Sequence, residues 1–215
     1  MIAPSGYPLR FFAESTKDEN LETMLNQING IYQIASANDL VAFADIVDGT
    51  NGAEQHTLAN AVLTADIGLT GVVWIPIGLY TDGIDVKSTG NYEGTFDGNG
   101  HVIQNLTVPR YDSYEVGLFG RTDQTTIRKL GIVNATVTSN KGVRCGVLGG
   151  EIYQSNVENC FTAGTITIST SNSQKGGIAG EGASSTRTEE LKALIRLLVY
   201  YQQTEKNHAD AESKK

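Results

Sequence analysis

The sequence contains little of what several common classes of protein require. It has two cysteines, four prolines and one tryptophan in 215 residues, and charged residues make up 19% of the chain. So few cysteines exclude a small disulfide-rich scaffold, and the composition excludes collagen or a coiled-coil rod as the main body. No apolar run approaches the roughly 20 residues that span a bilayer. The net charge of −8 argues against nucleic acid as a partner, because phosphate binding needs clustered Lys and Arg.

The N-terminal residues do not form a signal peptide, because Pro4 and Pro8 interrupt the apolar stretch. Cys145 and Cys160 are not accompanied by paired Cys or His at metal-ligand spacing. We expect both to be small buried apolar residues, and a disulfide between them is the alternative. The cysteines therefore leave the cellular compartment open.

A change in composition divides the chain. All 24 glycines lie at or before Gly182, whereas the last 33 residues have none and are rich in charge. We divide the chain into an N-terminal extension and helix (1–30), a glycine-rich body (31–183) and a C-terminal helix with a charged tail (184–215).

Two segments near the N-terminus have helical periodicity. Residues 15–29 carry Leu21, Met24, Leu25 and Ile28 on one face, and we interpret the Asn-Gly that follows as the end of that helix. Residues 36–47 begin with Ser36 and Asp39, which suit an N-terminal cap, and continue with an apolar stripe. Both helices are predicted to cover another structure.

From about residue 58 the pattern changes to short β-branched segments separated by Gly, Asn and Asp, which are typical of strands and tight turns. VGLFG (116–120) recurs as CGVLG (145–149) and as GGIAG (176–180), and TIRKLGIVNATVT (126–138) aligns with NVENCFTAGTITI (156–168). A unit of this size must stack on its neighbours to bury its apolar face, so the repeat predicts a solenoid. With roughly 20–25 residues per coil, we expect five or six coils, stacked at ~4.8 Å. The coil is expected to be right-handed, as parallel crossovers are.

These blocks resemble the GLUG repeat family. The similarity includes the lead-in IYQIASANDLVAFADIV and the block YEGTFDGNGHVIQNLTV (92–108), and it covers roughly residues 31–182. The resemblance implies an all-β fold, a single-stranded parallel β-helix with an N-terminal capping helix. It also implies a bacterial surface, secreted or phage-associated protein and an extracellular or cell-surface location, with adhesion as the expected role.

The sequence departs from the repeat after GGIAGEG. Thr186 and Glu189 form a capping box, and Leu191, Leu194, Ile195, Leu198 and Tyr201 line one helical face. The favoured interpretation of residues 188–201 is a helix that caps the solenoid. The alternative is self-association or binding of a partner through this helix.

Catalytic and metal-binding patterns are sparse. Asp82, Asp85 and Asp97 lie in TDGID and FDGNG, and carboxylates near a basic residue serve some β-helix lyases and hydrolases. Asp-Gly and Asn-Gly are also turn formers, which is the favoured interpretation here. We predict no cofactor, although a weak surface calcium site is open, and His56, His101 and His208 are too scattered to suggest a metal site.

Aromatic side chains could form a glycan-binding platform, because aromatic faces pack on sugars while Asp and Asn supply hydrogen bonds. The candidates are Trp74, Tyr80, Tyr92, Tyr111 and Tyr114. The alternative is that Trp74 belongs to the core and that the tyrosines fasten loops. We therefore predict a non-catalytic binding or stalk module with a glycan or host-surface ligand. A polysaccharide lyase or hydrolase, and a spacer assembling through its C-terminal helix, remain the alternatives.

Overall fold

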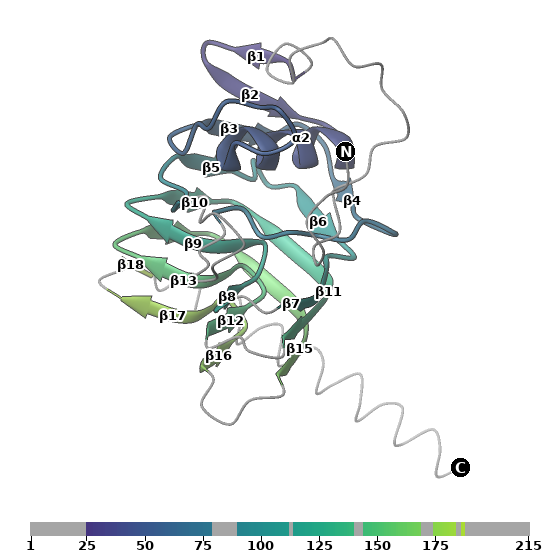
Figure 1. Cartoon of the computed structure of the whole chain (residues 1–215), viewed down its shortest axis with the longest axis vertical. Helices are drawn as coiled ribbons and strands as arrows, with labels where there is room; N and C mark the ends of the chain where they lie inside the picture. The colour runs from purple at the N-terminus through teal and green to yellow at the C-terminus, as the bar shows by residue number, and fades with distance from the viewer. Residues whose placement is uncertain are drawn as a thin grey trace.

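The fold is described here from a computed structural model of the chain. The structure describes residues 25–78, 90–111, 114–139, 144–168, 174–183 and 186–187. They form a parallel β-solenoid, which is the predicted fold, with about four turns (Figure 1). The expected C-terminal helix at 188–201 and most of the N-terminal extension lie outside the described residues.

The strands of successive coils stack in four columns. The first column is β1 (Gln27–Ile28), β2 (Ile31–Ile34), β3 (Asn60–Leu63), β5 (Thr95–Asp97), β10 (Thr126–Arg128), β14 (Asn156–Glu158) and β18 (Thr186–Arg187). The second is β4 (Ile67–Gly68), β6 (Val102–Gln104), β7 (Thr107–Tyr111), β11 (Gly131–Ser139) and β15 (Phe161–Ile168). The third is β8 (Glu115–Val116), β12 (Arg144–Gly146) and β16 (Gln174–Gly176), and the fourth is β9 (Phe119–Asp123), β13 (Gly149–Tyr153) and β17 (Ala179–Ala183).

The register gives the length of a coil. Thr126 pairs with Thr95 on one side and with Asn156 on the other, and Asn156 pairs with Thr186, all in parallel. One coil is therefore about 30 residues long. The expected length of 20–25 residues and the expected five or six coils were wrong, because the sequence repeat is a whole coil with four strands. The proposed alignment of 126–138 with 156–168 is confirmed residue for residue at its start.

The paired glycines of the repeat allow two columns to pack closely. A Cβ added to Gly117 would lie 2.6 Å from the carbonyl oxygen of Gly146, and one added to Gly150 would collide with the backbone nitrogen of Val116. Gly180 has the same relation to the backbone nitrogen of Cys145 one coil later. The G-hydrophobic-x-G motif thus marks the places where backbones of the third and fourth columns approach too closely for any side chain.

Helix α2 (Ala37–Asp48) closes the N-terminal end, as the sequence predicted for residues 36–47. The Ser36 hydroxyl accepts a hydrogen bond from the Asp39 backbone nitrogen at 3.2 Å, and the Asp39 carboxylate accepts one from the Ala35 nitrogen at 2.9 Å. Gly49, at φ 66°, ends the helix in the left-handed conformation. Figure 1 shows α2 beside β2 and β3 at one end of the stack.

The helix expected at 15–29 is contradicted at its C-terminal end. Gln27 and Ile28 form β1, which pairs antiparallel with β2. Asn29 and Gly30 both have positive φ, 54° and 75°, as in the tight two-residue turn of a β-hairpin. Ile28, assigned to an apolar helical face, is 54% exposed. Leu25, from the same predicted face, is 3% exposed and belongs to the core, and residues 15–24 lie outside the described residues.

The core is continuous along the stack, and aromatic rings fill it near α2. Phe43 of α2 makes edge contacts with Tyr32 and Tyr92, at ring-centre distances of 5.8 Å and 6.0 Å. Tyr92 stacks on Phe119 at 5.4 Å, and Phe96 packs between Phe43 and Phe119. These rings join the helix to the first coils.

Candidate functional site

The structure places two of the five predicted platform aromatics in the core. Trp74 is fully buried, and its indole Nε1 donates to the carbonyl oxygen of Leu118 at 2.9 Å. Tyr92 is also fully buried, and its hydroxyl donates to the carbonyl oxygen of Ala59 at 2.9 Å. Burial raises the pKa of Tyr92 well above its usual value. Neither ring offers a face to a ligand, so their assignment to a binding platform was wrong, and for Trp74 the core alternative is confirmed.

The other three candidates do not assemble a platform among the described residues. Tyr114 is exposed to 41%, just before β8. Tyr111 ends β7, but its side chain lies outside the described part of the structure, as does the whole of Tyr80. Only Tyr114 therefore stays a described, accessible aromatic of that set.

The described member of the aspartate cluster has a structural role. Asp97 lies on β5 and forms a two-point ion pair with Arg128 on β10, with Nε and Nη2 both 2.8 Å from Oδ2. Its other oxygen accepts the backbone N–H of Asn99 at 2.8 Å and so shapes the turn. Asp82 and Asp85 lie outside the described residues.

His101 follows the same turn and contacts a second carboxylate. Its Nδ1 lies 3.2 Å from Oδ1 of Asp66, which also accepts the backbone N–H of Val102 at 3.0 Å. The hydrogen bond from Val102, followed by that from His101, lowers the pKa of Asp66. Within the described ranges, no group of three or more His, Cys, Asp or Glu is placed to hold a metal ion.

Both cysteines are free and buried, as the favoured interpretation predicted. The Cys160 thiol points to the carbonyl oxygens of Glu158 and Ile127, at 3.2 Å and 3.7 Å. Burial raises the pKa of Cys145 and of Cys160 to about 11 each. At neutral pH these thiols are protonated and inert.

A partly buried ionic cluster between the third and fourth columns was not foreseen from the sequence. Arg144 on β12 contacts Glu115 at 2.8 Å, Glu151 at 3.6 Å and Glu181, while Arg121 contacts Glu151 at 3.2 Å. Burial raises the pKa of Glu115, and the hydrogen bond from Arg144 opposes that rise. The cluster connects three successive coils, so we assign it a structural role.

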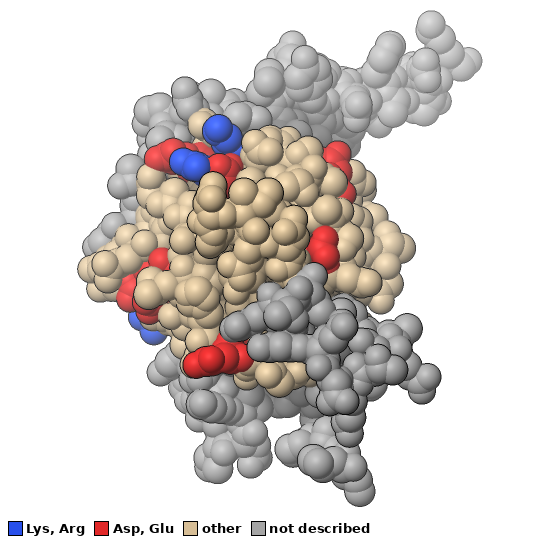
Figure 2. Space-filling view, turned by 90° about the horizontal axis from the view of Figure 1, so that it is seen from above, with Lys and Arg blue, Asp and Glu red and all other residues tan. Residues whose placement is uncertain are grey.

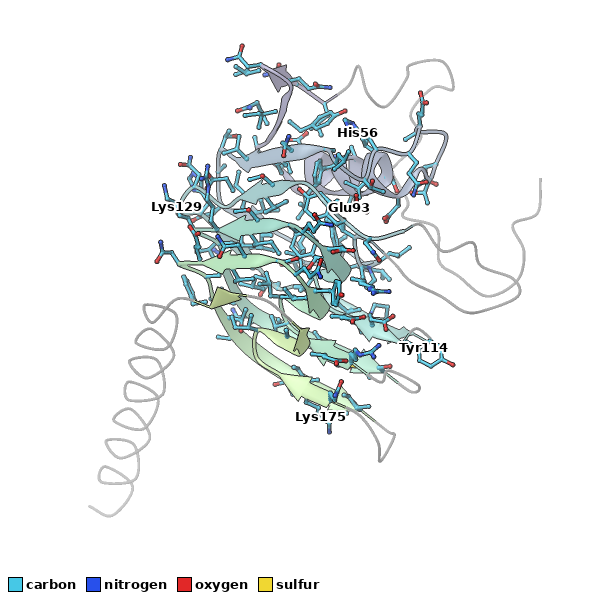
Figure 3. All side chains as sticks on the ribbon, turned by 90° about the vertical axis from the view of Figure 1, so that its left-hand side faces the viewer. His56, Glu93, Tyr114, Lys129 and Lys175 are labelled. Atoms are coloured by element: carbon cyan, nitrogen blue, oxygen red, sulfur yellow. The ribbon has the colours of Figure 1, made fainter. Side chains whose placement is uncertain are left out.

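A groove of about 300 Å³ lies at the corner between the first and second columns. Asn99, Lys129 and Asn159 turn this corner in successive coils, with φ of 51°, 51° and 52°. Phe161, which begins β15, is half-buried beside them. The lining consists of Asn99, Gly100, Lys129, Leu130, Gly131, Asn159 and Phe161. Figure 3 shows Lys129 at the edge of the solenoid opposite Tyr114.

This corner groove combines the features of a small-molecule site. The half-buried ring of Phe161 gives apolar surface, and two amides and an ammonium group surround it. None of these seven residues was predicted as a site from the sequence, because the predicted aromatic candidates lie in other segments of the chain. The signal was present in the repeat alignment, which sets Gly131 beside Phe161.

Comparison with known proteins adds a distant relative. No family model matches the chain. The chain is 30% identical over 172 residues to Halomucin of Haloquadratum walsbyi, a match that covers 76% of this chain and 2% of that protein. The chain thus spans about one-fiftieth of the relative's length.

A solved structure is similar at a lower level. A Bacteroides ovatus protein assigned as an immunoglobulin A1 protease shares 20% identity, with a TM-score of 0.43 over 71% of this chain and 62% of that one. No property is transferred from it. Among the described helices, none is long and apolar enough to cross a membrane.

Proposed function

We propose that the chain is a non-catalytic binding or stalk module of a microbial cell-surface or secreted protein, and that it binds glycans through the side of the solenoid. The observation that carries the binding role is the corner groove, an accessible aromatic and amide-lined site on a lateral face. Stacked coils suit display, because each coil contacts only its neighbours and length can be added by repetition.

The similarity to Halomucin supports this role. A match to 2% of a much longer protein is what a module of an extended chain would give. We also propose that the chain belongs with the GLUG-type repeats, because the strand register repeats at the spacing of the G-hydrophobic-x-G blocks. An extracellular location follows from both proposals.

Incubation with a panel of neutral and acidic polysaccharides tests the proposal. Retention of the protein on a polymer without release of new chain ends is the expected result. Release of chain ends that Asp97→Asn abolishes would contradict it and make the protein a lyase or hydrolase. Absence of both retention and release would also contradict a binding role.

A further inference from the structure

Beside the corner groove, one position of the second column carries no side chain. On the second column, Gly131 pairs with Val102 on one side and with Phe161 on the other. A Cβ at Gly131 would lie 2.5 Å from Cζ and 2.7 Å from Cε1 of Phe161, and 3.1 Å from Cγ2 of Val102. The Phe161 ring therefore lies over the backbone of β11, in space that any other residue would occupy.

This position suits Phe161 for stacking. The ring is half-buried and rests on the Gly131 backbone, so it loses little conformational freedom when a ligand packs on it. A flat ring held on a backbone is a suitable partner for the apolar face of a sugar ring.

The polar groups lie around this surface. The Asn99 amide nitrogen donates to the Leu63 carbonyl oxygen at 3.3 Å, which directs the amide and leaves its oxygen to accept from a ligand. Asn159 supplies a second amide at the same corner, one coil below Lys129. Amide oxygens and nitrogens can pair with neighbouring hydroxyls, as a sugar presents them.

The charge of the residues that line the groove indicates the charge of the ligand. Lys129 is the one charged residue among the seven that line the groove, although the chain carries −8 overall. It is exposed and forms no ion pair with the described residues, whereas its neighbour Arg128 is paired with Asp97. An ammonium group without a protein carboxylate favours an anionic substituent on the ligand.

We propose that the corner groove binds one sugar ring bearing a carboxylate, as a unit of an acidic polysaccharide. The sugar packs on Phe161, its hydroxyls bond to the amides of Asn99 and Asn159, and its carboxylate meets Lys129. This inference rests on the proposed function and specifies its ligand. A volume of about 300 Å³ is at the small end of ligand pockets, which suits one ring of a polymer and not several.

The test uses the whole chain with short oligogalacturonate as the acidic probe and a galactan oligosaccharide of the same length as the neutral one. Titration calorimetry gives the affinity, and amide chemical shifts in the unmodified protein give the location. We expect the oligogalacturonate to bind more tightly than galactan and to shift amides at residues 99–100, 129–131 and 159–161.

Four variants sharpen the result. Phe161→Ala should weaken oligogalacturonate binding about tenfold, since stacking on an aromatic ring is worth roughly one such factor. Gly131→Ala should do the same by displacing the ring, which as the end of a flexible side chain can move without unfolding the coil. Lys129→Gln should weaken acidic binding about threefold and leave galactan unchanged. Lys175→Gln makes the same charge change on β16 of the third column, away from the groove, and should alter neither affinity (Figure 3).

Other outcomes overturn the inference separately from the proposed function. If Tyr114→Ala abolishes binding and Phe161→Ala does not, the module binds glycans elsewhere and the groove assignment is wrong. Equal affinity for galactan and oligogalacturonate would remove the carboxylate from the proposal. Failure to bind any polymer of the wider panel would remove the proposed function itself. A thermal melt of each variant checks that the fold is retained.

Discussion

The N-terminal end of the solenoid and the other end of the described stack are stabilised by different interactions. At the N-terminal end, α2 places Leu40, Phe43 and Ile46 on the first coils, and all three are fully buried. At the other end of the described stack, Ile166 and Ile168 of β15 are only partly buried. There the coils are joined by close backbone packing at glycines and by the ionic cluster around Arg144.

The contrast shows how stability is distributed in this chain. In a stacked array each coil contributes its own packing and its contact with the next. A helical cap adds buried apolar area to one end, whereas ion pairs that are partly exposed contribute less.

Seen from above, the molecule presents a largely uncharged surface with acidic residues towards its rim (Figure 2).

The largest expected effect is at the capped end. Phe43→Ala should lower the free energy of unfolding by about 4 kcal/mol, because it removes a fully buried ring that contacts three others. Ile168→Ala should cost only about 1 kcal/mol, since that side chain is partly buried. Chemical denaturation monitored by circular dichroism measures both. Equal losses would show that the two ends contribute alike.

The next effect concerns the ionic cluster. Arg144→Met should cost about 3 kcal/mol at pH 7, because it leaves Glu115, which is 2% exposed, beside Glu151 without its main cation. Arg128→Met breaks the more exposed pair with Asp97 and should cost less than about 1 kcal/mol. Similar values for the two variants would contradict a buried role for the cluster.

The pH dependence of that cost has a definite sign. Burial raises the pKa of Glu115 in the folded state above its unfolded value. The stability that this group contributes is therefore fully present below the unfolded pKa and is lost as pH rises through the folded pKa. Without Arg144 the pKa rises further, so the penalty of Arg144→Met should shrink between pH 7 and pH 5. A penalty that stays constant over this range would show that Glu115 stays ionised.

A smaller effect tests the glycine motif. Gly150→Ala should cost about 2 kcal/mol, because its Cβ would collide with backbone atoms of Glu115 and Val116, which cannot rotate away. Gly177→Ala is the matched control, since its nearest neighbour is the Thr162 hydroxyl at 3.5 Å. We expect thermal midpoints to fall for the first variant alone. A fall for both would mean that glycine is required along the whole turn.

The smallest expected effect is on the reactivity of the two buried cysteines. With pKa values of about 11, Cys145 and Cys160 have roughly one thiolate per thousand thiols at pH 8. Alkylation of the folded protein should therefore be slow at both, and unfolding in denaturant should make both reactive. Rapid labelling of Cys160 alone would indicate that the coil nearer the C-terminus opens while the preceding coil, which holds Cys145, stays closed.

Much of the fold could be predicted from the sequence, because each coil needs the same residue types at the same positions. The G-hydrophobic-x-G blocks recur where backbones meet, and the capping residues Ser36 and Asp39 begin α2 as expected. The third block was displaced by one residue in the proposed alignment. In the structure Gly146 pairs with Gly176, and Cys145 pairs with Lys175. Glycine-rich segments can be aligned in more than one register by composition alone.

Other features depend on tertiary contacts, which the periodicity of the sequence does not reveal. Asn29-Gly30 fits a helix stop and a hairpin turn equally, and pairing with β2 decides for the hairpin. Trp74 and Tyr92 have polar atoms that suit a binding surface, but backbone carbonyls within the core satisfy them. The corner groove could have been found in the repeat alignment by asking which residue lacks a side chain next to an aromatic one.

The connection between the second and third columns lengthens from coil to coil. β7 ends at Tyr111 and β8 begins at Glu115, β11 ends at Ser139 and β12 begins at Arg144, and β15 ends at Ile168 and β16 begins at Gln174. The connecting segment thus grows by one residue per coil, while the strands on either side keep their parallel pairing. The length of the connection is therefore decoupled from the strand register at this edge. We therefore expect foreign peptides, such as epitopes or affinity tags, to be tolerated at these connections without loss of strand pairing.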